Sequence, residues 1–223
     1  MEPSPDALAR LRHIAIEGPI GAGKSSLARK LAGHLDAELM LEKPEENPFL
    51  ERFYDDSAGY AFQTQVFFLF QRLRQVRELA QPGMFTQAVV SDFMFAKDAL
   101  FARMNLSDEE YHLYAQMYAQ LAPQVPQPDL VVWLQASAPT LLQRIRQRAA
   151  PMEQRITSTY LQTLCDAYAD HFRHYDGAPV LAVDTEHFHP AANEADFASL
   201  LDRLADLRAR RAFLDPRGEA ALA

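Results

Sequence analysis

The chain has 223 residues, of which 48% are hydrophobic and 23% are charged, and its formal net charge is −8. A chain of this length can bury one sizeable core, and the composition is that of an ordinary soluble globular protein. The acidic balance excludes a protein that simply coats nucleic acid, although it leaves room for a local basic pocket. The single cysteine, Cys165, excludes a disulfide framework within one chain.

We expect no segment that directs the chain into a membrane or out of the cell. Its apolar runs are all shorter than the roughly 18 residues of a membrane span, and residues 1–6 lack the basic and apolar regions of a signal peptide. A single cysteine also suits a reducing compartment. We therefore expect a cytoplasmic protein with neither membrane nor nucleic-acid partners.

The first predicted elements are a strand, a glycine-rich loop and a helix. Residues 12–16 have the pattern of a short buried strand, residues 18–26 read GPIGAGKSS, and leucines recur every fourth residue from Leu27 to Leu35. The loop fits the pattern G-x-x-x-x-G-K-[ST] of the phosphate-binding P-loop. A glycine-rich structural turn is the alternative, but the order strand, loop, helix favours a phosphate site.

The residue types of this loop suit the phosphates of a nucleotide. Glycines let the backbone curl until successive N–H groups converge on phosphate oxygens, and the helix N-terminus adds its positive end. Lys24 can reach the β- and γ-phosphates, and Ser25 can place its hydroxyl on Mg²⁺. The predicted ATP-binding residues are Gly18, Gly21, Ala22, Gly23, Lys24, Ser25 and Ser26.

Short apolar runs alternate with helical patterns along the chain. The five predicted strands are 12–16, 38–41, 88–91, 129–134 and 179–183. Continuous rather than alternating hydrophobicity is typical of strands buried on both faces, and strands separated by helices imply a parallel sheet. We expect one α/β domain over residues 1–223, a three-layer sandwich of the P-loop NTPase type with a five-stranded parallel sheet, helices on both faces and a flexible tail at 212–223.

Four further helices are indicated by apolar residues at helical spacing. One runs through 66–76 and ends near the Pro-Gly pair at 82–83, and a second follows a capping box that starts at Ser107. The other two are centred on 156–168 and 200–207. With the strands, these helices account for the whole chain as one domain.

Acidic residues follow two of the predicted strands. Glu42 comes directly after the second strand and Asp92 directly after the third. Ligands of open parallel sheets bind beyond the carboxyl ends of the strands. Phosphoryl transfer needs one carboxylate near the attacking hydroxyl and another near Mg²⁺, so both residues are candidates, with solvated loop acids as the alternative.

Two other stretches allow a structural and a functional interpretation. Arg144 and Arg148 share one face of the helix after the fourth strand; this face is either solvated or a lid whose arginines close over transferring phosphates. Phe62 and Gln63 lie in an aromatic-rich stretch that is either ordinary core or a nucleobase site. In a base site, the ring would stack and the amide would donate to and accept from the base edge.

Taken together, these residues resemble the deoxynucleoside kinase family, specifically its bacterial deoxyadenosine/deoxyguanosine kinase branch, over about residues 14–188. The resemblance rests on the P-loop, on Glu42 followed by residues 46–50, on Phe53-Tyr54, on Phe62-Gln63-Thr64, and on Arg144-x-x-x-Arg148 with Glu153-Gln154. It implies ATP- and Mg²⁺-dependent phosphorylation of the 5′-hydroxyl of a deoxynucleoside, with a purine as the expected base, in nucleotide salvage. It also implies a homodimer.

The same resemblance implies a role for each matching residue. Glu42 is the expected base for the 5′-hydroxyl, and Arg144 and Arg148 are the expected catalytic lid arginines. The residues expected to bind substrate are Tyr54 and Glu153 at the sugar 3′-hydroxyl, Phe62 and Gln63 at the base, and Asp92. Ser25 and Asp92 are the expected metal-side residues.

The chain departs from the family pattern in two places. Glu42 is followed by Lys43 before a proline, where the family usually has Glu-Pro, and Asp92 is followed by Phe93, where the family usually has arginine. Lys97, about one helical turn later, is the candidate for the missing charge.

Two other functions are alternatives to this one. A thymidylate-type nucleoside monophosphate kinase would need extra basic residues around its acceptor, and Glu42 is a poor neighbour for an incoming phosphate. A non-catalytic nucleotide-binding regulatory subunit would keep Lys24 and Ser25 without needing the other site residues together. The deoxynucleoside kinase hypothesis explains more of the sequence than either.

Overall fold

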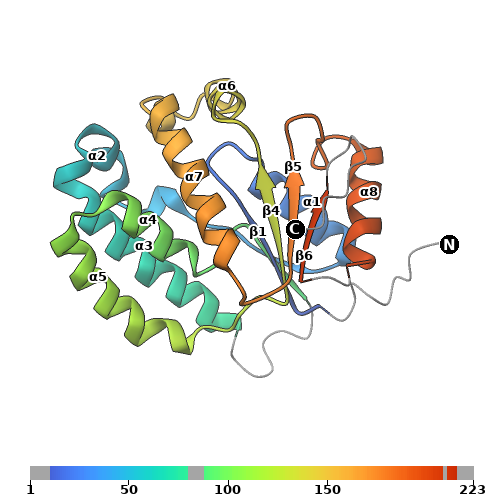
Figure 1. Ribbon diagram of the computed structural model, residues 1–223, viewed down its shortest axis with the longest axis horizontal. Helices are drawn as coiled ribbons and strands as arrows, with labels where there is room; N and C mark the ends of the chain where they lie inside the picture. Colours follow the sequence, from blue (N-terminus) through green and yellow to red (C-terminus); the bar gives the residue numbers. More distant parts are fainter. Residues whose placement is uncertain (1–10, 80–87, 208–209, 215–223) are drawn as a thin grey trace.

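The computed structural model describes residues 11–79, 88–207 and 210–214, which form a three-layer α/β sandwich (Figure 1). Its centre is a six-stranded sheet in the order β2-β3-β1-β4-β5-β6, and all neighbouring strands are parallel. The strands are β1 (His13–Glu17), β2 (Glu38–Met40), β3 (Val89–Ser91), β4 (Leu130–Gln135), β5 (Val180–Asp184) and β6 (Arg211–Leu214). The expected fold class is confirmed.

Eight α-helices and three short 3₁₀ turns lie within the described residues. The α-helices are α1 (Lys24–Leu35), α2 (Leu50–Asp55), α3 (Ser57–Leu79), α4 (Lys97–Asn105), α5 (Asp108–Leu121), α6 (Ala138–Arg148), α7 (Ser158–His174) and α8 (Glu194–Ala205). The 3₁₀ turns are η2 (Pro44–Glu46), η3 (Ala122–Gln124) and η4 (Pro151–Glu153). The predicted capping box is present: the Ser107 hydroxyl accepts from the Glu110 N–H, and the Glu110 carboxylate accepts from the Ser107 N–H. The predicted helix end near 82–83 lies outside the described residues.

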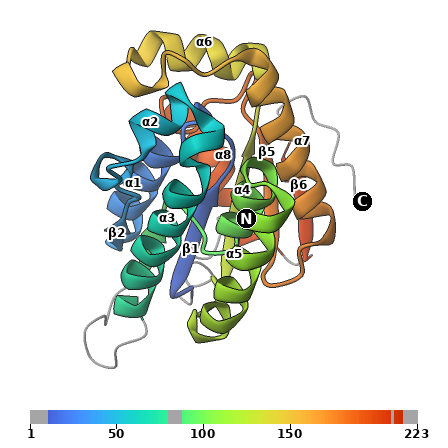
Figure 2. The same cartoon turned by 90° about the vertical axis from the view of Figure 1, so that its left-hand side faces the viewer.

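Helices cover both faces of the sheet because its central strands are apolar on both sides. In β1, Ile14 belongs to the core that α1 and α8 complete, whereas the next residue, Ala15, belongs to the core that α4 and α7 complete. Figures 1 and 2 show these helices on opposite sides of the strands. Such a sheet brings the carboxyl ends of β1, β2 and β3 to one edge, where the candidate site residues follow.

A second group of helices stands beside the sheet. Helices α2, α3 and α5 pack with α4 around an apolar cluster of their own, which includes Phe53, Leu69 and Tyr114. Figure 2 shows α3 and α5 running side by side, with α2 above the upper end of α3. This group forms one wall of the space above the carboxyl end of the sheet.

The sheet has one more strand than the sequence predicted. Strand β6 pairs with β5 at the edge of the sheet, so residues 212–214, predicted as part of a flexible tail, belong to a strand; residues 215–223 lie outside the described part. Three of the four residues of this strand are apolar, and none of the four is buried. An edge strand of this kind lacks the continuous apolar run that marks the central strands.

None of the helices that the structure describes is long and apolar enough to span a membrane.

Candidate active site

The loop between β1 and α1 has the backbone geometry of a phosphate cradle. Gly18, Gly21 and Gly23 have φ angles of 145°, 86° and 95°, in the region that residues with a side chain rarely adopt. A Cβ atom at Gly18 would collide with the carbonyl oxygen of Leu134, and one at Gly21 would lie 2.9 Å from that of Leu141. Glycine is therefore needed where the loop passes β4 and α6.

Lys24 lies inside this loop and places a cation there. Its ammonium donates to the carbonyl oxygens of Gly18 (2.8 Å) and Pro19 (3.0 Å). Burial, helped by the nearby ammonium of Lys97, lowers the pKa of Lys24 to about 8, against the opposing effect of neighbouring carboxylates. Lys24 therefore stays charged at neutral pH, next to a second lysine.

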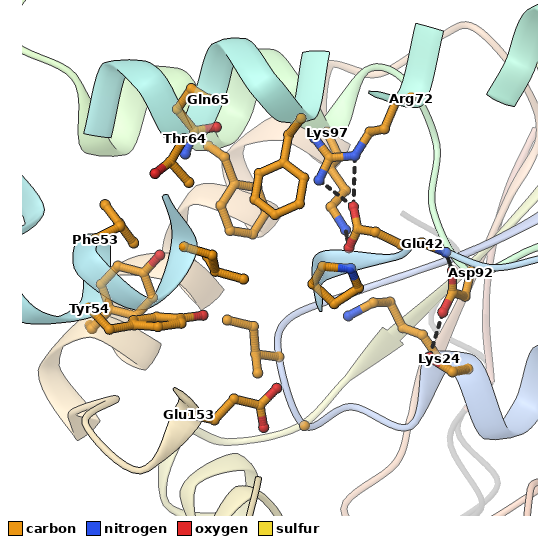
Figure 3. A pocket seen from close by; sticks show the side chains of 18 of the residues that line it. Lys24, Glu42, Phe53, Tyr54, Thr64, Gln65, Arg72, Asp92, Lys97 and Glu153 are labelled. Atoms are coloured by element: carbon orange, nitrogen blue, oxygen red, sulfur yellow. Dashed lines mark hydrogen bonds and ion pairs between the residues drawn. The ribbon is translucent and has the colours of Figure 1, made fainter. Parts of the chain in front are cut away.

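A cavity of about 160 Å³ opens beside Lys24 at the carboxyl end of the sheet (Figure 3). We call it the inner cavity. It is bounded by the P-loop, the segment after β2, helices α2, α3 and α4, the end of β3, and the segment around η4. Its lining includes Lys24, Ser25, Glu42, Tyr54, Gln65, Arg72, Asp92, Lys97, Arg148 and Glu153.

Glu42 is held at the centre of a charged network in this cavity. Its Oε1 accepts from Arg72 Nε (2.7 Å) and its Oε2 accepts from Lys97 Nζ (3.0 Å), as Figure 3 shows. Arg72 also forms an ion pair with the fully buried Asp98. Burial alone would raise the pKa of Glu42, but Arg72 and Lys97 outweigh it and lower the pKa to about 2. Glu42 is therefore an ionised hydrogen-bond acceptor throughout the physiological pH range.

Asp92 connects the P-loop to the segment that carries Glu42. Its Oδ2 accepts from the Ser25 hydroxyl, and its Oδ1 accepts from the backbone N–H of Glu42 at 2.7 Å. The two predicted metal-side residues therefore lie side by side. No cluster of three or more His, Cys, Asp or Glu that could hold a metal occurs in the described residues. A hydroxyl and one carboxylate beside a phosphate-binding loop are nevertheless the oxygen donors that Mg²⁺ uses when phosphates and water complete its shell.

Tyr54 and Glu153 come from distant parts of the chain and line the same cavity. Tyr54 is on α2, and burial raises its pKa well above the usual range, so the hydroxyl stays a neutral donor. Glu153, in η4, accepts from Arg148 Nε at 3.1 Å. In Figure 3 both side chains lie on the lower side of the cavity, below Thr64 and Gln65.

The two predicted lid arginines separate in the structure. Arg148 lines the inner cavity, where it is hydrogen-bonded to Glu153. Arg144 instead donates to the Thr185 hydroxyl (3.1 Å) and carbonyl oxygen (2.5 Å) after β5. Arg144 lines a second pocket, of about 190 Å³, with residues 21–23 of the P-loop, Ser26 and residues 188–192. We call this the outer pocket. The P-loop therefore lies between two pockets, each with one arginine of the pair.

A family model described as deoxynucleoside kinase matches residues 14–207. The chain belongs to the deoxynucleoside kinase family. It is 34% identical over 199 residues to the deoxyguanosine kinase of Bacillus subtilis, covering 87% of this chain and 96% of that protein. It is 31% identical over 185 residues to the deoxyadenosine kinase of Lactobacillus acidophilus, covering 77% of this chain and 84% of that one.

Solved structures of the family have the same fold as this kinase. The deoxyadenosine kinase from M. mycoides with bound dATP is 26% identical and superimposes with a TM-score of 0.74, over 86% of this chain and 98% of that one. The structure of that enzyme with bound dCTP gives a TM-score of 0.73 at 25% identity, over 87% and 100%. The predicted kinase activity and family are confirmed by these comparisons together.

The structure does not bring the predicted base-reading pair into the inner cavity of the kinase. Phe62 and Gln63 line a surface groove on the outer side of α3, and Gln63 is exposed. The side chain of Gln65 enters the cavity instead and is 3% exposed, with its Oε1 unpaired within the described structure. Two residues along a helix turn the side chain by about 200°, so a shift from 63 to 65 exchanges the two faces of α3.

The charged partners of Glu42 were also missed as a set. Gln65, Phe68 and Arg72 follow one another at i, i+3 and i+7 on α3 and all line the cavity. Two polar residues at this spacing within an otherwise apolar helix face were the available signal. Asp98 gave no such signal, because only the packing of α4 against α3 buries it beside Arg72.

Proposed function

We propose that this kinase transfers the γ-phosphoryl group of ATP to the 5′-hydroxyl of a purine deoxynucleoside and supplies the monophosphate to nucleotide salvage. The observation that carries the proposal is the shared cavity in which a P-loop lysine, Glu42 and the Tyr54–Glu153 pair meet. The names of the bacterial relatives, deoxyguanosine kinase and deoxyadenosine kinase, support a purine.

Glu42 acts on the acceptor hydroxyl in this proposal. Its ionised carboxylate accepts a hydrogen bond from the 5′-hydroxyl, orients the oxygen for in-line attack and takes the proton as the bond to phosphorus forms. Arg72 and Lys97 hold the carboxylate in place at 2.7 Å and 3.0 Å. Because these cations keep the pKa of Glu42 near 2, orientation precedes proton transfer, which occurs late, as the attacking oxygen becomes acidic.

The sugar and the base are bound on opposite sides of the cavity. Tyr54 donates to the 3′-hydroxyl and Glu153 accepts from it. Gln65 pairs with the edge of the base, because its amide both donates and accepts and its oxygen has no partner among the described residues. Arg72 lies two helical turns further along the same face of α3 and limits the depth at which the base can sit.

Lys97 takes the place of the family arginine that is missing after Asp92. Phe93 occupies the arginine position and is 1% exposed in the apolar cluster of α3 and α5, so it supplies no charge. Lys97 lies in the cavity instead, close enough to Lys24 to lower that residue's pKa. An anionic phosphoryl group between the two ammonium groups would relieve their repulsion.

Mg²⁺ binds with ATP at Ser25 and Asp92 in this proposal. The hydroxyl and carboxylate of these residues already face each other at the P-loop. When bound, the ion would neutralise negative charge on the phosphates of the donor. Arg144 would hold the donor nucleotide from the outer pocket, rather than act in catalysis as its spacing from Arg148 suggested.

Two further properties belong to the proposal. The groove that Phe62, Val66, Phe67 and Phe70 form on α3 leaves Phe70 51% exposed, and we propose that a second copy covers it in a homodimer. Size-exclusion chromatography with light scattering would give twice the chain mass for the wild-type protein, and the mass of the monomer for Phe70→Lys.

Use of ATP and a single cysteine support a cytoplasmic location.

A panel of the four deoxynucleosides, assayed for ADP release from Mg-ATP, tests the function. We expect release that depends on the added nucleoside, with deoxyadenosine or deoxyguanosine giving the highest kcat/KM and a 5′-monophosphate as product. Higher activity on deoxynucleoside monophosphates than on nucleosides would contradict the proposal, as would ATP hydrolysis that no nucleoside stimulates.

A further inference from the structure

Glu17 is a buried carboxylate directly before the P-loop. It is the last residue of β1 and its side chain is 0% exposed. No ion pair joins it to a lysine or arginine in the part of the chain that the structure describes. Burying a carboxylate costs folding free energy unless hydrogen bonds satisfy it. The donors around Glu17 therefore show how its burial is compensated.

Three donors from three elements meet at this carboxylate. Its Oε1 accepts from the Gly18 N–H (3.0 Å) and the Tyr168 hydroxyl (2.7 Å), and its Oε2 accepts from the Met94 N–H (2.9 Å). Gly18 begins the P-loop, Met94 follows the end of β3, and Tyr168 belongs to α7. One side chain therefore connects the P-loop, the loop after β3 and helix α7.

The segments that Glu17 connects carry the catalytic groups. Met94 lies two residues after Asp92, whose carboxylate accepts from the Ser25 hydroxyl and from the Glu42 N–H. Helix α7 follows η4, the turn that carries Glu153 into the inner cavity. A change in the position of Met94 relative to Gly18 would move Asp92 relative to the P-loop, and Glu42 with it.

Only a carboxylate can satisfy all three donors at once. A glutamine has one acceptor oxygen, and its NH₂ group would face either the Met94 N–H or the Gly18 N–H, donor against donor. An apolar residue of similar size would leave both N–H groups buried and unpaired. The requirement is for negative charge and two acceptor oxygens rather than for volume.

We propose that Glu17 is a positioning residue for phosphoryl transfer, which holds the Asp92 loop in register with the P-loop and ties both to α7. The proposal rests on the kinase function proposed above and adds to it a residue that touches neither substrate. It acts on the geometry of transfer, whereas Gln65 and Tyr54, which bind the base and the sugar in that function, lie on α3 and α2.

Glu17→Gln tests this through kinetics rather than stability alone. We expect kcat to fall about 10- to 100-fold, the rate effect of one hydrogen bond to a charged group, and the KM for ATP to rise. The Kd of the deoxynucleoside, measured by calorimetry without ATP, stays within about twofold of wild type. Wild-type kcat and KM in folded Glu17→Gln would overturn the proposal.

His13→Gln is the matched control for a purely structural effect. His13 begins the same strand, at its end remote from the P-loop, and is also buried. Its Nε2 is hydrogen-bonded to the Ser91 hydroxyl of β3 (2.8 Å), a bond that a glutamine amide can keep. This variant should lower Tm and leave kcat unchanged. An equal loss of kcat in both variants would assign the effect of Glu17 to stability and overturn the positioning role.

Tyr168→Phe keeps the proposal testable if Glu17→Gln does not fold. It removes one donor and keeps the ring in the core, and we expect a three- to tenfold lower kcat with unchanged nucleoside affinity. Wild-type kinetics in Tyr168→Phe would remove α7 from the proposal. Wild-type kinetics in both Tyr168→Phe and Glu17→Gln would overturn the positioning role as a whole. Inactivity of the wild-type protein on every nucleoside would instead contradict the proposed function.

Discussion

The two pockets on either side of the P-loop are built in different ways. The inner cavity presents side chains in a mutually dependent network, with Glu42 paired to both Arg72 and Lys97 and Asp98 buried behind them. The outer pocket presents the backbone of residues 21–23 and one arginine, which is bonded to Thr185. The inner side can therefore distinguish molecules and do chemistry, whereas the outer side is suited to hold a ligand.

The difference also predicts how each side responds to mutation. Removing one partner of a buried ion pair costs about 3–5 kcal/mol because the other charge is left uncompensated. Arg144 is partly exposed, and partly exposed charge contacts contribute about 1 kcal/mol or less. Substitutions should therefore have large effects on rate and selectivity on the inner side and small effects on ATP binding on the outer side.

The largest effect is expected at Lys24, which lies between the two pockets. Lys24→Ala removes the cation that stabilises the transferring phosphoryl group and should abolish measurable turnover. Circular dichroism and Tm should match wild type, because the ammonium contacts only loop carbonyls. Residual turnover within tenfold of wild type would remove the P-loop lysine from the mechanism.

Glu42→Gln should lower kcat by about 10²–10⁴-fold, the usual contribution of a positioned general base, with the nucleoside KM nearly unchanged. Glu45→Gln is the control, since Glu45 is exposed on η2 in the same segment. Steady-state kinetics of both variants would decide the matter. A loss confined to KM would assign Glu42 to binding instead.

The sugar contacts can be tested with the substrate itself. A 2′,3′-dideoxynucleoside leaves the buried Tyr54 hydroxyl unpaired, at about 1–3 kcal/mol, and removes one hydrogen bond from the Glu153 carboxylate, which keeps its contact with Arg148. Wild type should therefore prefer the deoxynucleoside by at least tenfold in kcat/KM, and the Tyr54→Phe/Glu153→Ala double variant should lose most of this preference. An unchanged preference in the double variant would mean that other residues hold the 3′-hydroxyl.

The two glutamines of α3 form a matched pair. Gln65→Ala should raise the nucleoside KM by roughly 5- to 100-fold, the effect of losing hydrogen bonds in a buried site. Gln63→Ala, on the exposed face, should leave kinetics unchanged. The reverse result would restore Gln63 as the base-reading residue and contradict the assignment of the inner cavity as the base site.

The smallest effect is expected in the outer pocket. Arg144→Ala should raise the KM for ATP by about fivefold or less, consistent with a partly exposed contact, and should not change the nucleoside KM. Arg146→Ala, on the exposed face of α6, provides the control. A fall of 100-fold or more in kcat would place Arg144 on the transferring phosphate and remove the contrast between the two pockets.

Much of the fold could be predicted because its signals are local. The bounds of the five predicted strands each differ by at most one residue from those of an observed strand. Strands buried on both faces require continuous apolar runs, which can be recognised in the sequence. The P-loop was predictable because positive φ angles at Gly18, Gly21 and Gly23 require glycine. Glu42 and Asp92 could be singled out because parallel strands end at a common edge.

The sequence by itself thus determined the class of fold, the phosphate-binding loop and the acids beyond the strands, each through a rule that acts within a few residues. Only the tertiary structure decided that α3 turns Gln65 inward, that Arg72, Lys97 and Asp98 form one network around Glu42, and that β6 pairs at the edge of the sheet. These features depend on how separate helices and strands pack together. Packing sets which face of an amphipathic helix is buried, and it places Gln65 rather than Gln63 in the cavity.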